Sequence, residues 1–212
     1  MKKILILVLA LIAIIAFVSY SKKPVTLPSL SEDGKSIIHS TKVLLSIEDP
    51  AIFSFFQKAE TGMCDSSNIT NTATRAAFCT DPLVFKQKTK FTKLVHSVSG
   101  TDFGFVVETT ELSPDTVVGI VTKTESGNKV TLLTNYYLGN DFLGFSPSGS
   151  KFAYKERCWE AVCGFTIKDT ATLRTMREFG NPETDPATTF TRWINDSSIE
   201  YVLGSEILNI TF

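Results

Sequence analysis

Histidine is scarce in this chain, because only His39 and His96 occur among its 212 residues. Neither histidine lies at a spacing that is typical of a metal site or of a catalytic triad. The sequence also lacks the glycine-rich loop that binds phosphate groups in nucleotide-binding proteins. It therefore predicts no catalytic residue, no metal site and no cofactor.

Basic residues are few outside the N-terminus. Of the 21 Lys and Arg residues, Lys2, Lys3, Lys22 and Lys23 flank the first apolar run, which leaves 17 basic residues against 22 acidic ones. Binding to a nucleic-acid backbone depends on a basic surface. The acidic balance of the remaining chain argues against nucleic acid as a partner.

A long hydrophobic run is present only near the N-terminus, where Ile4 to Tyr20 lies between Lys2-Lys3 and Lys22-Lys23. As a helix it would span roughly 25 Å, slightly less than the hydrocarbon core of a bilayer. Residues 1–23 therefore form either a signal anchor, with a hydrophobic helix in the membrane through residues 4–20, or a signal peptide. We favour the anchor, because the best cleavage site, Ser19-Tyr20-Ser21, is poor. This predicts a single-pass protein of the cell membrane with its C-terminal domain outside the cytoplasm, and a secreted protein is the alternative.

Cysteine is limited to Cys64, Cys79, Cys158 and Cys163. An even number of cysteines in an exported chain favours disulfides, and proximity in the sequence favours the pairs Cys64–Cys79 and Cys158–Cys163. The first bridge would close a polar stretch that the sequence predicts to be a surface loop. Free buried thiols and a metal site are the alternatives, although the spacing fits no common zinc motif.

The residues after the hydrophobic run divide into a tether and one domain. Residues 24–34 have the Pro, Ser, Asp and Gly content of a linker. Residues 35–212 are expected to form a single extracytoplasmic β-rich domain, with one or two strands between Ser36 and Ile47. A short helix over residues 51–60 is also expected, because Asp49-Pro50 supplies a helix cap and a proline at the first helical position.

Three lysines alternate with aromatic and polar residues between Leu83 and Leu94. In a strand this period of two places Lys86, Lys88 and Lys90 on one face and the phenylalanines on the other. The sequence therefore predicts a strand, with these lysines as candidate binding residues for an anion or a polysaccharide. The alternative is the solvated face of an edge strand, where lysine opposes aggregation.

From Asp102 onwards the apolar pattern recurs every 47 residues. Each unit has a turn-rich entry and alternating strands. Equivalent positions are Phe105, Phe152 and Ile199, then Val107, Tyr154 and Tyr201, and the pairs Val118–Phe165 and Ile120–Ile167. Repeats of about 40 to 50 residues with short strands are typical of propeller blades. The predicted fold is therefore mainly β, with antiparallel blade-like meanders that form a partial propeller or a sandwich-like sheet.

The sequence FSPSGSKFAY at residues 145–154, and Trp193-Ile194-Asn195-Asp196 in the next unit, resemble the blade-opening motif of the TolB-type periplasmic β-propellers. The resemblance covers residues 92–212. It departs from the family in that Ser148 stands where an Asp usually precedes the glycine. Members of this family mostly bind proteins or oligosaccharides, or lie beside a catalytic domain, so the resemblance implies a binding role but assigns no contact residue.

These features predict a membrane-tethered extracytoplasmic module that binds a protein or a glycan at the cell envelope and has no catalytic activity. One alternative is a secreted or envelope hydrolase that uses paired carboxylates such as Asp102, Glu108 or Asp141, since such pairs leave no sequence motif. The other is a structural subunit that assembles by adding its C-terminal strand, Ile207 to Phe212, to a partner's sheet.

Overall fold

The computed structural model of the chain describes residues 26–58, 64, 73–110, 115–134, 137–159, 162–181 and 185–212. In these ranges the protein is mainly β, as predicted, with four antiparallel sheets and three helices. The predicted N-terminal hydrophobic helix lies outside them. No helix within the described ranges is long and apolar enough to cross a bilayer.

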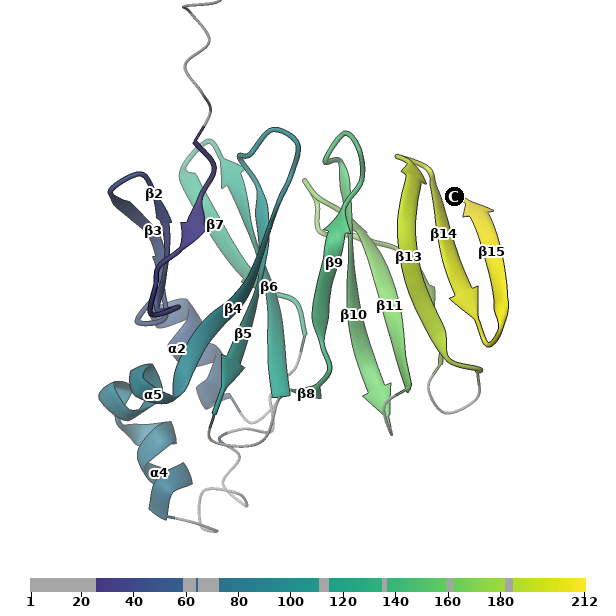
Figure 1. The fold of residues 1–212 in the computed structure, drawn as a ribbon. Helices are drawn as coiled ribbons and strands as arrows, with labels where there is room; N and C mark the ends of the chain where they lie inside the picture. The colour runs from purple at the N-terminus through teal and green to yellow at the C-terminus, as the bar shows by residue number, and fades with distance from the viewer. Residues whose placement is uncertain are drawn as a thin grey trace, which may run out of the picture.

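The first sheet follows directly from the start of the described chain (Figure 1). In it β1 (Ser29–Leu30) pairs with β2 (Ser36–His39), which pairs with β3 (Lys42–Ser46). Pro28 is buried. The predicted linker over residues 24–34 is therefore wrong from residue 28 onwards, because a strand of two residues is held by its contacts and leaves no pattern in the sequence.

The predicted short helix over residues 51–60 is confirmed as α2 (Pro50–Gln57). The Asp49 carboxylate accepts a hydrogen bond of 2.9 Å from the backbone N–H of Ala51, which satisfies one of the unpaired donors at the start of the helix. Proline occupies the first turn, where its missing N–H has no cost.

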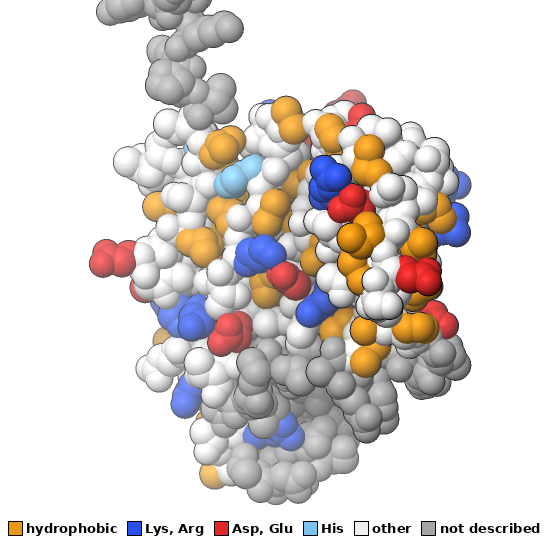
Figure 2. All heavy atoms as spheres, turned by 45° about the vertical axis from the view of Figure 1, so that its right-hand side comes forward, with side chains coloured by type: hydrophobic (Ala, Val, Ile, Leu, Met, Phe, Trp, Pro, Cys, Tyr) orange, Lys and Arg blue, Asp and Glu red, His pale blue; other side chains and the backbone are white. Residues whose placement is uncertain are grey.

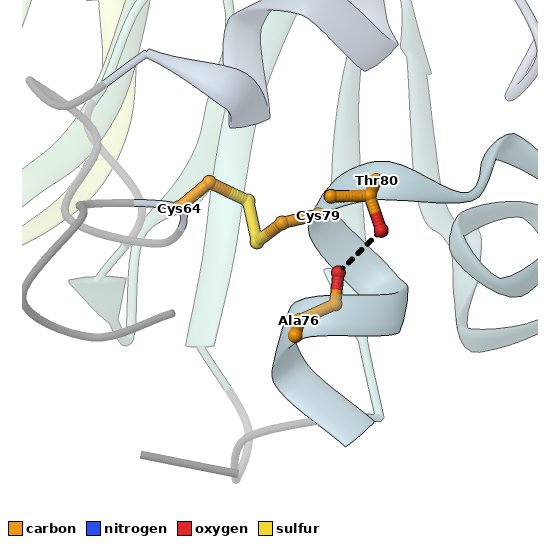
Figure 3. The surroundings of a disulfide bond; sticks show 4 residues. All are labelled: Cys64, Ala76, Cys79 and Thr80. Atoms are coloured by element: carbon orange, nitrogen blue, oxygen red, sulfur yellow. Dashed lines mark hydrogen bonds between the residues drawn. A yellow bond between two sulfur atoms is a disulfide. The ribbon is translucent and has the colours of Figure 1, made fainter. Parts of the chain in front are cut away.

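The predicted disulfide between Cys64 and Cys79 is confirmed, with the two Cα atoms 5.6 Å apart (Figure 3). Cys79 lies on α4 (Ala73–Thr80), so the predicted loop between the two cysteines is wrong over this helix. Cys163 is also disulfide-bonded, which rules out a free thiol at that position. The side chain of Cys158 lies outside the described part of the structure.

The strand predicted between Leu83 and Leu94 is wrong over its first half. The chain forms α5 (Pro82–Lys88) and enters a strand only at Thr89. The Asp81 carboxylate accepts a hydrogen bond of 2.8 Å from the N–H of Leu83, as the equivalent aspartate does in α2. This Asp-Pro start signal prevails over the alternation of lysines, because Phe85 is buried among the aromatic rings of the helices.

Three antiparallel meanders follow, and each is one sheet (Figure 1). The second sheet contains β4 (Thr89–His96), β5 (Phe103–Thr109), β6 (Asp115–Thr124) and β7 (Gly127–Leu132), with β8 (Tyr137–Leu138) paired to β6. The third contains β9 (Asp141–Phe145), β10 (Lys151–Trp159), β11 (Val162–Asp169) and β12 (Thr175–Phe179). The fourth contains β13 (Thr188–Asn195), β14 (Ser198–Leu203) and β15 (Glu206–Thr211). The predicted blade-like meanders are therefore present.

The 47-residue spacing matches the packing of these sheets. Phe105, Phe152 and Ile199 lie on β5, β10 and β14, are fully buried, and each faces the preceding sheet. Val118 and Phe165 lie on β6 and β11 and face the following sheet. Residues at equivalent positions of the repeat thus lie on corresponding strands, and their side chains point the same way in successive sheets. These sheets lie next to one another in Figure 1.

The first strands of the three repeated sheets run parallel to one another. A Cβ added at Gly149, in the turn after β9, would lie 3.2 Å from Ser97 Cβ in the turn after β4. The N–H of Ser148 donates a hydrogen bond of 2.8 Å to Asp196 Oδ1 in the turn after β13. These turns therefore lie together at one end of the stack.

The first strand of the first sheet, β1, runs in the opposite direction to β4. Gly34 follows β1, and its carbonyl accepts a hydrogen bond of 2.8 Å from the N–H of Phe91 at the start of β4. Leu27 precedes β1 and packs over Gly100, beyond the end of β4. The end that carries residues 26–27 and the turns 97–102, 146–151 and 195–198 is called the exit end below, and the end that carries α2 and α5 is called the helical end.

Candidate interaction site at the helical end

Two helices with the same start signal meet at the helical end. The sequence Asp-Pro-x-x-Phe begins at Asp49 for α2 and at Asp81 for α5. Because each helix is fixed at its first residue, the phenylalanine that ends the motif falls on the same turn in both. The rings of Phe53 and Phe85 pack edge to face with centroids 5.0 Å apart.

A pocket of about 220 Å³ opens between these helix starts. Its walls are formed by Glu48, Pro50, Phe53, Pro82, Leu83 and Phe85. Small-molecule sites usually have roughly 300 to 1,000 Å³. This pocket therefore has the size to hold one apolar side chain of a partner, and Leu83, whose side chain is 65% exposed, lies on its wall.

An ion pair lies at the edge of the pocket. Lys86 Nζ is 2.8 Å from Glu48 Oε1, and the side chains are 39% and 56% exposed. An exposed pair of this kind contributes about 0 to 1 kcal/mol to stability, so either charge is available to exchange partners. An apolar pocket with a charged rim is the arrangement found where one protein anchors a side chain in another.

The structure separates the three lysines that the sequence places on one strand face. Lys86 and Lys88 lie in the last turn of α5, and only Lys90 lies on a strand, opposite Glu108 of β5. Of the three, Lys86 is the one that borders the pocket through its ion pair. Their role in binding an anion or a polysaccharide stays a prediction.

A fourth lysine, Lys35, caps the C-terminal end of α5. Lys35 Nζ donates hydrogen bonds to the carbonyls of Lys86, Gln87 and Thr89 at 2.6, 3.1 and 2.6 Å. These carbonyls include groups that a helix end leaves unpaired. Burial lowers the pKa of Lys35 by more than the nearby charge of Asp33 raises it. Lys35 therefore fixes the position of the helix that carries the pocket wall.

Of the carboxylates named in the hydrolase alternative, Asp102 is separated from Glu108 by the length of β5. Asp102 Oδ1, at the exit end, accepts a hydrogen bond of 2.9 Å from the N–H of Lys123. Both oxygens of Asp141 accept from Lys93 Nζ at 2.9 Å. Glu108 lies six residues beyond Asp102 along β5, on the order of 20 Å away at the usual rise of a strand.

A polar cluster on the third sheet, in which Tyr154 and Thr166 are buried and Glu178 is exposed, has no motif in the sequence. Tyr154, Thr166 and Glu178 are cross-strand neighbours on β10, β11 and β12. Thr166 Oγ1 donates to Glu156 Oε1, and burial, followed by the charge of Glu156, raises the pKa of Tyr154. Only the strand register brings these residues together, so a search along the chain cannot find them. Tyr154 is 2% exposed and therefore lies away from a bound ligand, whereas the exposed Glu178 also lines the pocket described next.

A second, more polar pocket of about 270 Å³ lies between the third and fourth sheets. Arg177, Glu178 and Asp185 contribute charged groups to its walls. Phe179 and Tyr201 contribute aromatic rings whose centroids are 5.2 Å apart. Aromatic rings next to charged side chains suit a ligand that carries both C–H faces and hydroxyl groups.

Comparisons with models of protein families, with curated proteins and with solved structures gave no match for this chain.

Proposed function

We propose that this chain is a membrane-tethered extracytoplasmic module that binds a protein partner through the pocket at the helical end. The Cys64–Cys79 disulfide supports an oxidising compartment outside the cytoplasm. The hydrophobic run at residues 4–20 supports a tether in the membrane. The likeness of residues 92–212 to TolB-type propeller blades supports a role in binding.

The pocket itself is the observation that carries this proposal. It lies at the helical end, away from the end where the described chain begins, so a tethered module presents it to the aqueous phase (Figure 1). Its apolar walls fit an apolar side chain, and Lys86 at the rim fits a neighbouring carboxylate that replaces Glu48. The partner segment therefore carries an apolar residue next to an acidic one.

The experiment compares two aspartate substitutions in the full-length protein. Leu83→Asp places a charge on the wall of the pocket, and Ile207→Asp places one at an equally exposed position on β15. Leu83 lies in the first turn of α5, where an acidic residue is favourable, so the variant should fold. The measurement is the amount of envelope protein that each variant captures by crosslinking in cells. Leu83→Asp should lower this capture by about tenfold, as expected for the loss of a contact of about 1.4 kcal/mol, and Ile207→Asp should leave it unchanged. Equal capture by both variants would rule out the pocket as the site.

A glycan ligand is the second candidate, and the polar pocket between the third and fourth sheets favours it. An arginine, two carboxylates and two aromatic rings line that pocket. Binding of the full-length protein to envelope polysaccharides, weakened by Arg177→Ala and unchanged by Leu83→Asp, would support the glycan and exclude the helical pocket as its site.

A further inference from the structure

We propose that the exit end of the module docks on the surface of the lipid bilayer. This inference rests on the proposed tether, in which residues 4–20 lie in the membrane. It goes beyond that function, because a tether alone leaves the orientation of the module free. The observations that carry it are the short length of chain between the hydrophobic run and the first sheet, and the side chains that the exit end exposes.

The tether is much shorter than the sequence suggests, because the chain is attached to the fold from residue 26 onwards. The carbonyl and hydroxyl oxygens of Thr26 lie 2.7 and 3.0 Å from His39 Nε2 in the hairpin between β2 and β3. Leu27 packs over Gly100, and β1 follows. Only residues 21–25 separate this attachment from the hydrophobic run, and five residues reach at most about 18 Å.

The exit end also exposes apolar side chains. Leu27, Val43, Val98 and Ile194 are exposed by 48, 53, 77 and 46%. Val98 and Ile194 lie in or next to the turns that meet at this end, and Leu27 packs over one of these turns at Gly100. Val43 follows the hairpin that holds Thr26. Figure 2 shows hydrophobic side chains along the upper edge of the molecule, below the point where the described chain begins.

A lipid surface fits this end better than another protein does. The tether holds the exit end beside the bilayer at an effective concentration on the order of millimolar, so a weak apolar contact is enough. The exposed side chains are spread over separate turns, which suits insertion into a soft interface rather than docking into a shaped pocket. Lys42, next to the hairpin that holds Thr26, adds a positive charge that anionic headgroups attract, and Asp102 and Asp196 at the same end oppose it, so the apolar side chains carry the contact. Docking of this end would direct the helical end into the aqueous phase.

The test uses the full-length protein in vesicles of phosphatidylcholine and phosphatidylglycerol. Val98→Cys and Leu83→Cys each add one thiol at an exposed position, at the exit end and at the helical end respectively. Each thiol is labelled with an environment-sensitive fluorophore while the native disulfides stay oxidised. The label at residue 98 should shift to the blue and be quenched by spin-labelled lipids, and the label at residue 83 should show neither effect. Ile194→Cys provides a second reporter, which should behave like Val98→Cys.

The outcomes separate the docking from the tether. If the protein floats with the vesicles and all labels respond equally weakly, the docking is wrong and the tether stands. If the protein stays in the supernatant, both the tether and the docking are wrong. If the label at residue 83 is quenched instead, the module lies the other way up, and the helical end is the lipid-facing surface.

Discussion

The turn at residues 31–36 in the first sheet and the turn at residues 146–151 in the third sheet have the same hydrogen bonds. The N–H of Gly34 donates to the carbonyl of the first serine at 2.9 Å, and Gly149 does the same at 2.8 Å. In both turns the hydroxyl of that serine accepts from the N–H of the last residue, at 2.9 and 3.1 Å. The two turns nevertheless lie at opposite ends of the molecule, because β1 runs antiparallel to β4, whereas β9 runs parallel to it.

This difference shows that the first sheet is not a fourth copy of the repeat. A repeated sheet presents its entry turn to the entry turn of the next sheet, as Gly149 does to Ser97. The first sheet instead places Gly34 against the backbone of Phe91 and covers the face of the second sheet together with the helices. The first sheet and the three helices together act as a cap on the stack, and the pocket and the disulfide belong to this cap.

The largest expected effect comes from removing a phenylalanine in each region. Phe152→Ala should lower the free energy of unfolding by about 3 to 5 kcal/mol, because the ring is fully buried between two repeated sheets. Phe85→Ala should cost less, since that ring already borders an open pocket. Urea unfolding of both variants measures the difference. An equal or larger loss for Phe85→Ala would mean that the cap carries as much stability as the repeats.

Replacing Cys64 and Cys79 together by alanine should have the next largest effect. The disulfide closes a loop over a separation of 15 residues, and restraint of the unfolded chain by such a loop contributes about 3 kcal/mol. Because the bridge lies in the cap, amide hydrogen exchange should accelerate in α4 beyond the global change. Amides of β10 should follow the global change only. A uniform acceleration in both elements would show that cap and repeats open as one unit.

Alanine substitutions at the two turn glycines should have a smaller effect. Gly34 has φ of 68° and Gly149 has φ of 79°, where a side chain costs about 1 to 2 kcal/mol. A Cβ at Gly34 would also lie 3.0 Å from the carbonyl oxygen of Phe91, whereas a Cβ at Gly149 would lie 3.2 Å from a side-chain carbon. Gly34→Ala should therefore be the more destabilising in thermal unfolding. The reverse order would indicate that the cap adjusts more easily than the repeats.

The repeated sheets were predictable because period-two apolar runs and glycine-rich turns are local signals, and so was α2, which starts at Asp49-Pro50. The same signal occurs at Asp81-Pro82, where α5 starts, although the alternation of the lysines that follow it is typical of a strand. The reversed direction of the first sheet was not predictable, since it depends on the contact between Gly34 and Phe91 across the stack.

The candidate site shows the same limit. Its walls come from two segments, residues 48–53 and 82–85, that only the folded helices bring together. Of the predicted binding residues only Lys86 lies at its rim, and the prediction placed that lysine on a strand. Residues that meet through packing rather than through local spacing leave no pattern along the chain.

The smallest expected effect comes from replacing the carboxylates of Asp33 and Asp196, which lie in a turn of the first sheet and a turn of the fourth sheet. The N–H of Ser148 lowers the pKa of Asp196 below its ordinary value of 3.8, and the hydroxyl of Ser31 does so for Asp33. A carboxylate with a lowered pKa stabilises the fold above pH 4, and this contribution is lost as the pH falls through the lowered pKa. Asp33→Asn and Asp196→Asn should therefore each flatten the loss of stability in acid. Only Asp196→Asn should accelerate hydrogen exchange at the N–H of Ser148, because Asp196 joins two sheets, whereas Asp33 bonds within its own turn. Unchanged exchange at Ser148 would show that the charge of Asp196 is not needed to hold the turns of the third and fourth sheets together.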